Sequence, residues 1–203
     1  MRLARLPMTR GSCLVLVAAL GIWGCVPEHA RHAQLPTANC LPGERGYLRA
    51  GLRGAMDRDI DWRGAQLQCE GGARPMGNGL RVSFSGTTTG QGQKLRIVFG
   101  IAAPPGAHAA SNLPTNITVI VEGENRLYTT RGADKCQVES MVQESLQGAP
   151  GIHDYRIAAR GFCVDPATTL DGSGRLYINR FDFAGIARFE DNELHAPEPA
   201  AAS

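Results

Sequence analysis

The six cysteines constrain this chain more than any other residue type, because their positions divide them into three groups. Cys13 lies inside an apolar N-terminal run, and Cys25 ends that run. The other four lie farther along, within or next to segments that alternate apolar and polar residues; they are Cys40, Cys69, Cys136 and Cys163. An even set of widely spaced cysteines predicts up to two disulfides in an oxidising compartment.

The N-terminal segment has the pattern of an export signal. Its beginning contains Arg2, Arg5 and Arg10 and no acid, and an apolar stretch follows. A basic start, an apolar core and small residues near its end are typical of a secretory signal peptide. The apolar run is shorter than the ~20 residues that a membrane-spanning helix needs. The sequence therefore predicts that residues 1–24 are a signal peptide; a short membrane anchor or a buried core helix is the alternative.

The end of the apolar run resembles the lipobox of bacterial lipoproteins. Ile22 is the aliphatic residue of that motif, Trp23 stands at its tolerant position, Gly24 is its small residue and Cys25 is the lipidated cysteine. The resemblance implies that Cys25 becomes the mature N-terminus and carries a diacylglyceryl thioether. Two or three acyl chains anchor a protein stably, since each buried methylene contributes ~0.8 kcal/mol. The alternative is an unmodified thiol, left after cleavage by the general signal peptidase.

The same resemblance implies a location and a set of partners. In bacteria with two membranes, Asp directly after the lipidated cysteine favours retention in the inner membrane, and Val26 stands at that position. We therefore expect the outer membrane rather than the inner membrane. The lipid on Cys25 would contact the membrane, and an envelope protein or a glycan would be the partner of the domain.

The net charge argues against nucleic acid as a partner. The whole chain has 21 lysines and arginines against 19 acids, but removal of the signal peptide takes away three arginines and no acid. The mature chain is therefore close to neutral. It lacks both the basic footprint that nucleic-acid-binding proteins carry and the polybasic segment that binds anionic lipids.

After a proline-containing tether over residues 25–42, the sequence indicates one all-β domain over residues 43–191. Period-two alternation and turn residues at short intervals predict about nine strands, over residues 47–52, 60–69, 80–85, 95–101, 117–121, 126–130, 136–142, 154–164 and 175–183. Such a count favours a single antiparallel β-sandwich of jelly-roll or immunoglobulin-like build, with a closed barrel as the alternative. Residues 192–203 are expected to be a disordered tail.

The four domain cysteines can pair in three ways. Pairing Cys40 with Cys69 and Cys136 with Cys163 would close two loops of similar length, each stabilising the fold by about 3–4 kcal/mol in the chain-entropy model. The spacing alone leaves the connectivity open. Zinc is disfavoured, because no two of these cysteines have the close spacing that zinc sites use. An even set of paired cysteines also leaves no thiol for catalysis.

No metal or cofactor is expected. The stretch from Asp171 to Gly174 resembles the middle of an EF-hand loop, but Arg180 then falls where the bidentate glutamate should be. A hairpin turn is the favoured interpretation of that stretch. His29 and His32 lie on the tether, with none of the surrounding residues that orient metal ligands. The chain contains no phosphate loop, dinucleotide fingerprint or Gly-x-Ser-x-Gly elbow.

The speculative ligand-binding residues are aromatic side chains and one asparagine. Strict alternation over residues 175–183 puts Tyr177, Asn179 and Phe181 on one face, and Trp62 is the only tryptophan after the signal peptide. Such a strip suits stacking on sugar rings or apolar ligands. The favoured interpretation is that these aromatics fill the core, since aromatic residues fit well on buried β surfaces.

We therefore expect a membrane-anchored envelope lipoprotein whose β domain has a non-catalytic role in binding or structural interaction. The alternative is a carbohydrate- or small-ligand-binding module, in which a predicted loop over residues 102–114 contributes to the site. A secreted-type hydrolase is the third hypothesis. A Ser–His–Asp site can assemble from distant segments, but no pattern in the sequence predicts one.

Overall fold

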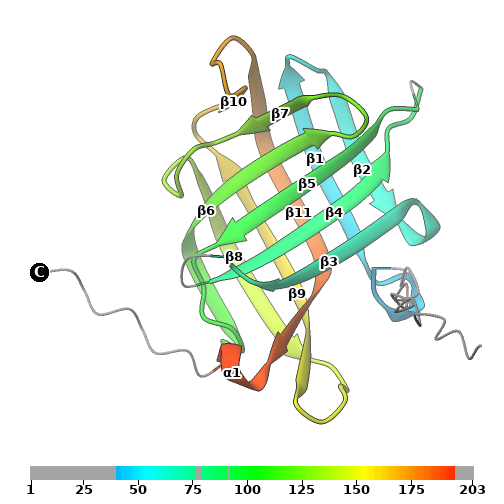
Figure 1. Cartoon of the computed structure of the whole chain (residues 1–203), viewed down its shortest axis with the longest axis vertical. Coiled ribbons are helices and arrows are strands. Elements are labelled where there is room, and N and C mark those ends of the chain that lie inside the picture. The colour runs from blue at the N-terminus through cyan, green and yellow to red at the C-terminus, as the bar shows by residue number, and fades with distance from the viewer. Residues whose placement is uncertain (1–39, 76–78, 91, 195–203) are drawn as a thin grey trace, which may run out of the picture. The chain divides into compact units, whose positions relative to one another are not determined.

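The computed structural model of the chain describes residues 40–75, 79–90 and 92–194 (Figure 1). The expected signal peptide, Cys25 and most of the expected tether lie outside the described residues, as do residues 195–203 of the expected tail. No helix in the described part of the chain is long and apolar enough to cross a membrane.

Antiparallel strands form two facing layers. The front layer in Figure 1 contains β3 (Leu67–Ala73), β4 (Leu80–Thr87), β5 (Lys94–Ile101), β6 (Ala109–Val121) and β7 (Arg126–Thr129). The back layer contains β1 (Tyr47–Gly54), β2 (Arg58–Arg63), β8 (Cys136–Ser145), β9 (Ile152–Cys163) and β11 (Arg175–Glu190). The remaining elements are β10 (Ala167–Thr168), the 3-10 helices η1 (Pro42–Glu44) and η2 (Gly64–Gln66), and the helix α1 (Asp191–Leu194). The predicted antiparallel β-sandwich is confirmed.

Hydrogen bonds run continuously from one layer to the other through two strands. β6 pairs with β8 over its first half and with β5 and β7 over its second half. On the other side, β10 pairs with both β7 and β11. All eleven strands of the described residues therefore belong to one hydrogen-bonded sheet, in which β11 lies between β1 and β9.

Two adjacent glycines allow the edge strand β3 to approach the last part of β11. A Cβ atom on Gly71 would lie 2.5 Å from the carbonyl oxygen of Ile186, and one on Gly72 would lie 2.9 Å from that of Arg188. Because real Cβ atoms do not approach other atoms so closely, only glycine fits at this contact between the two layers.

Four phenylalanine rings fill the centre of the space between the layers. The ring centroids of Phe99 and Phe183 are 4.6 Å apart, and those of Phe84 and Phe181 lie 5.0 Å from Phe183 and Phe99, respectively. None of the four is more than 3% exposed. Burial of each such side chain contributes about 1.5–3 kcal/mol, so this cluster stabilises the contact between the layers.

Three strand assignments differ from the sequence expectation. The strand expected over residues 60–69 is two strands, β2 and β3, separated by η2. The second part of the expected loop over residues 102–114 is strand, because β6 begins at Ala109 and pairs with β8. β11 continues to Glu190, opposite β9. For β6 and β11, pairing with another strand, rather than local alternation, sets the boundary.

The disulfides join Cys40 to Cys69 and Cys136 to Cys163. Cys136 and Cys163 are directly opposite each other on β8 and β9, whereas Cys40 ties the segment before β1 to the edge strand β3. Cys40 and Leu41 are 3% and 1% exposed, so the packed core begins inside the segment expected to be a tether. Two disulfides indicate an oxidising, exported compartment.

Candidate functional site

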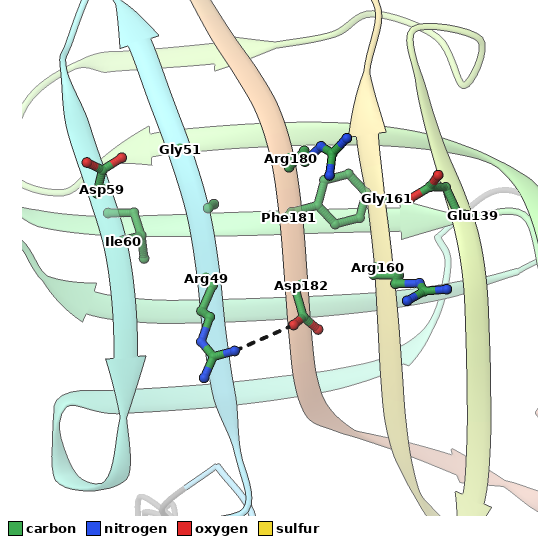
Figure 2. Close-up of a pocket in the computed structure, with 11 residues that line it drawn as sticks. Arg49, Gly51, Asp59, Ile60, Glu139, Arg160, Gly161, Arg180, Phe181 and Asp182 are labelled. Atoms are coloured by element: carbon green, nitrogen blue, oxygen red, sulfur yellow. Dashed lines mark ion pairs between the residues drawn. The ribbon is translucent and has the colours of Figure 1, made fainter.

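A hollow with a volume of about 380 Å³ lies on the outer face of the back layer, across β1, β2, β8, β9 and β11 (Figure 2). Its floor is formed by small or inward-pointing residues of the central strands, such as Gly51 and Gly161. Six charged residues surround it; they are Arg49, Asp59, Glu139, Arg160, Arg180 and Asp182. Two β-bulges shape it, and we call it the bulge hollow.

The first bulge is in β11. Gly51 of β1 lies opposite two residues of β11, Asn179 and Arg180, because the pairing register shifts at this point. Both of these residues are exposed, while Ile178 and Phe181 on either side of them are buried. A bulge adds one residue to a strand and so interrupts its in-and-out alternation. Arg180 therefore faces solvent, although strict alternation would turn it inward together with Ile178.

The second bulge is in β8. Val138 pairs with Gly161 of β9 and Ser140 pairs with Arg160, which leaves Glu139 without an opposite residue on β9. Glu139 is exposed, Ser140 is partly exposed and Val138 is fully buried. The added residue thus places an extra carboxylate on the outer face of the layer.

The two bulges lie at the same level of the sheet. Gly161 pairs with Val138 on one side and with Phe181 on the other, so it is next to both bulges. Figure 2 shows Glu139 and Arg180 on the two sides of Gly161, with Arg160 beside them on β9. Three charged groups from three strands therefore surround one glycine.

On β1, the charges beside the hollow are paired within the protein. The guanidinium of Arg49 lies 3.8 Å from Asp182 and 3.6 Å from Asp61. The phenol of Tyr47 donates a hydrogen bond of 2.8 Å to Asp182. Burial raises the pKa of Tyr47, and the Asp182 carboxylate raises it further. Asp182 is therefore held by two partners from β1.

The side chains of Arg160, Arg180 and Glu139 have no hydrogen bond or ion pair with any residue in the described part of the chain. Arg160 is directly opposite Asp182 in the register, but its guanidinium points toward β8 in Figure 2. By contrast, Arg156, four residues earlier on β9, lies 3.2 Å from Glu144. The hollow thus presents two guanidinium groups and one carboxylate that are free to bind a ligand.

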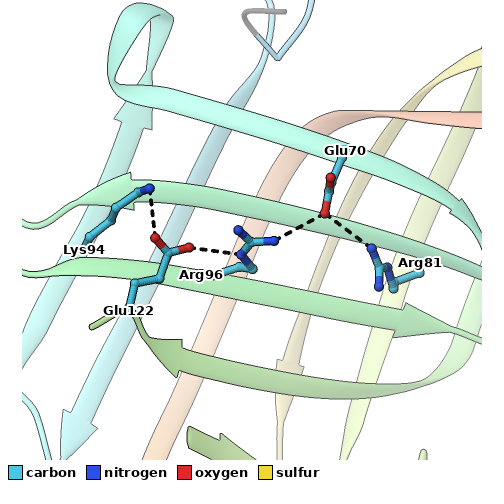
Figure 3. A network of polar contacts seen from close by, with 5 residues as sticks. All are labelled: Glu70, Arg81, Lys94, Arg96 and Glu122. Carbon is cyan, nitrogen blue, oxygen red and sulfur yellow. Dashed lines mark hydrogen bonds and ion pairs between the residues drawn. The ribbon is translucent and has the colours of Figure 1, made fainter. Parts of the chain in front are cut away.

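The outer face of the front layer is also charged, but its charged groups form ion pairs with each other (Figure 3). Glu122 lies 2.8 Å from Lys94 and 3.1 Å from Arg96. Glu70 lies 3.4 Å from Arg81 and 3.5 Å from Arg96. Hydrogen bonds, above all from Lys94, hold the pKa of Glu122 below its ordinary value. Because each of these groups already has a partner, this face offers a ligand less than the bulge hollow does.

The four residues expected to bind a ligand do not share a face. Trp62 and Phe181 are each 3% exposed, and the indole N–H of Trp62 donates to the carbonyl oxygen of Thr87 at 3.1 Å. Tyr177 is 44% exposed and Asn179 is exposed as well. The shared face of Tyr177, Asn179 and Phe181 does not form, because the β11 bulge lies between them. The favoured interpretation, that the aromatics fill the core, is confirmed for Trp62 and Phe181 and is wrong for Tyr177.

Sequence reasoning missed the charged residues of the hollow, although the sequence contains a signal for both bulges. Residues 138–141 read Val-Glu-Ser-Met and residues 178–181 read Ile-Asn-Arg-Phe. Each has two polar residues between two large apolar ones, inside a strand that otherwise alternates. This break in period two is what a bulge with two outward residues produces.

The only contact between a histidine and a carboxylate in the described residues joins His153 to Asp191, at 2.6 Å. Asp154, next to His153 in sequence, instead binds the guanidinium of Arg188 at 2.7 and 2.9 Å. No hydroxyl or thiol of the described residues forms a hydrogen bond with the His153 ring. A Ser–His–Asp arrangement is therefore not formed there.

The stretch that resembles an EF-hand loop is a turn between β10 and β11, as the favoured interpretation predicted. The Asp171 carboxylate accepts hydrogen bonds from the Thr169 hydroxyl and from the N–H and hydroxyl of Ser173. These bonds, the one from Thr169 above all, lower the pKa of Asp171 to about 2. Among the described residues, no three His, Cys, Asp or Glu side chains are grouped closely enough to hold a metal ion.

Comparison with models of protein families, with curated proteins and with solved structures finds no match to this chain. Because one fold can support many functions, the chemistry and geometry of the site indicate the function of this chain.

Proposed function

We propose that this chain is an exported, lipid-anchored protein of the bacterial cell envelope whose β domain binds a partner without catalysing a reaction. Two disulfides support the exported compartment. The resemblance of residues 1–25 to a lipoprotein signal supports lipidation of Cys25, and Val26 favours the outer membrane.

The observation that carries the binding role is the bulge hollow. Its Arg160, Arg180 and Glu139 have no partner in the described residues, whereas the charges on the front layer are paired with each other. Bulges occur often beside functional sites, where they change the direction of a side chain. Arginine is also among the residues that contribute most to the binding energy of interfaces.

The residues that line the hollow support binding rather than catalysis. The lining contains arginines, carboxylates, glycines and apolar residues, but no histidine, cysteine, serine or lysine. It therefore offers no hydroxyl, thiol or amine nucleophile and no imidazole base, so it lacks the Ser–His or Cys–His pair of a nucleophilic hydrolase. The buried positions of Trp62 and Phe181 also argue against an aromatic platform for sugar rings.

Metabolic labelling with a palmitate analogue tests the anchor. We expect label on the wild-type protein and none on the Cys25→Ser variant. A wild type without label, or label that persists after Cys25→Ser, would contradict lipidation at this residue.

Site-specific photo-crosslinking in intact cells tests the location of the binding surface. A photoreactive amino acid at Ser140, beside the hollow, should capture a discrete partner. The control position is Ile120, which lies partly exposed on β6 in the front layer. Capture from Ile120 but not from Ser140 would contradict binding at the hollow.

A further inference from the structure

We infer that the bulge hollow binds a zwitterionic peptide segment, with a carboxylate of the peptide held by Arg160 and Arg180 and a cationic group of the peptide placed at Glu139. This inference rests on the proposed binding function and specifies the chemistry of the partner.

The two arginines can bind one carboxylate together when the guanidinium of Arg160 turns from β8 toward β11. Arg180 of β11 pairs with Phe162 of β9, and Arg160 pairs with Asp182, so the two arginines are diagonal neighbours on adjacent strands. Diagonal neighbours on one face of a sheet lie about 7–8 Å apart, within reach of long side chains. Guanidinium groups match the planar geometry of a carboxylate and form charge-assisted hydrogen bonds with it.

Glu139 sets the second requirement on the ligand. It comes from β8, on the far side of Gly161 from Arg180, and has no cation of its own in the described residues. A ligand that carried only negative charge would be repelled by Glu139 and by the Asp59 and Asp182 carboxylates around the hollow. A ligand with a positive group beside its carboxylate would satisfy both the arginines and Glu139.

A peptide fits this surface better than a nucleic acid or a phosphate-rich polymer. The hollow is lined by three arginines and three acids, so it lacks the excess of positive charge that polyanions require. Phe162 is partly exposed directly opposite Arg180, and Val164, two residues farther along, is 69% exposed. These two side chains offer apolar contact to a peptide side chain that lies next to the carboxylate.

The binding test uses the full-length protein, purified in detergent from membranes, and an array of end-blocked tetrapeptides. The probes are Ala-Glu-Lys-Ala and Ala-Lys-Glu-Ala, with matched peptides in which Gln replaces Glu or norleucine replaces Lys. We expect at least one of the two charged peptides to bind about tenfold more protein than either of its neutralised forms, since each change removes a charge-assisted contact.

Variants test separately whether the two arginines bind the carboxylate of the peptide and whether Glu139 binds its cationic group. Arg160→Gln and Arg180→Gln should each weaken binding of every Glu-containing peptide by about tenfold. Glu139→Gln should abolish the preference for Lys over norleucine but keep the preference for Glu over Gln. The matched control is Arg63→Gln on β2, because Arg63 is exposed and paired with Asp61 at 2.9 Å. It should bind the peptides as the wild type does.

Two results would overturn the inference. One is peptide binding that the Arg160→Gln/Arg180→Gln double variant retains in full. The other is binding of heparin, a polyanion, that depends on both arginines and becomes stronger in Glu139→Gln. Crosslinking from Ser140 distinguishes an error in the proposed ligand chemistry from an error in the proposed binding function. If the double variant still captures the same partner, the binding role stands and only the proposed chemistry is wrong.

Discussion

Phe181 of β11 lies directly opposite Gly161 of β9, at the floor of the bulge hollow and at the edge of the phenylalanine cluster. A Cβ atom on residue 161 would lie 2.6 Å from Cζ of the Phe181 ring and 2.1 Å from the carbonyl oxygen of Gln137 on β8. The absence of a side chain at 161 therefore lets three strands pack closely while the ring stays in the core.

We expect Gly161→Ala to lower the free energy of unfolding by about 1–3 kcal/mol, because a backbone atom would have to move to accommodate the methyl group. Urea denaturation of the Cys25→Ser mature chain measures this. The matched control is Gly51→Ala in the same hollow, where a Cβ atom would meet only Asp59 Oδ1, at 3.8 Å. Equal losses in the two variants would contradict the close packing at Gly161.

Removal of either disulfide should lower the free energy of unfolding of the domain. The two bridges have sequence separations of 29 and 27 residues, so the chain-entropy model gives each a contribution of about 3–4 kcal/mol. We expect Cys40→Ser/Cys69→Ser and Cys136→Ser/Cys163→Ser to lose similar amounts in the same denaturation experiment. A loss below about 1 kcal/mol for either pair would argue against this origin of stability.

The positive φ of Asn112 should make this position tolerate glycine or asparagine better than a β-branched residue. Asn112 has a φ of 55°, and its neighbours Ser111 and Leu113 pair with residues on either side of Glu139. A β-branched residue is strained in this left-handed region, by about 1–2 kcal/mol. We expect Asn112→Val to reduce stability by that amount and Asn112→Gly to be neutral or slightly stabilising. Ser111→Val, at an exposed neighbour, serves as the control and should change stability by less than about 0.5 kcal/mol.

Asp171 should remain charged in unusually acidic solution. Hydrogen bonds from Thr169 and Ser173 lower its pKa to about 2 from an ordinary value of 3.8. Since the folded-state pKa is the lower one, the carboxylate stabilises the fold above the unfolded-state pKa, and this contribution is lost as the pH falls through about 2. NMR titration of the carboxyl carbon measures the pKa directly.

The Thr169→Val variant removes the largest cause of that shift. We expect the pKa of Asp171 to rise toward 3.8 in this variant. A wild-type titration midpoint near 3.8 would show that the hydrogen bonds from Thr169 and Ser173 do not stabilise the charged Asp171 carboxylate.

Parts of the fold follow from local sequence. Alternation predicts most of β4, β5 and β9, and the turns at 122–125 and 171–174 contain the residues that hairpin connections use. The strand expected at 60–69 and the loop expected at 102–114 show the limit. The first is interrupted by η2, and residues 109–114 of the second belong to β6 through pairing with β8. Neither outcome depends on the alternation of the segment itself.

The sequence by itself determined the all-β class, the positions of most strands and the presence of cysteines that can pair, because these depend on residue type and on a two-residue period along the chain. Only the tertiary structure decided which cysteines are joined, which way Arg180 and Phe181 point, and that Glu139 and Arg180 lie on the two sides of Gly161. Those features depend on register between strands distant in sequence, and one added residue in a strand turns every side chain after it to the other face.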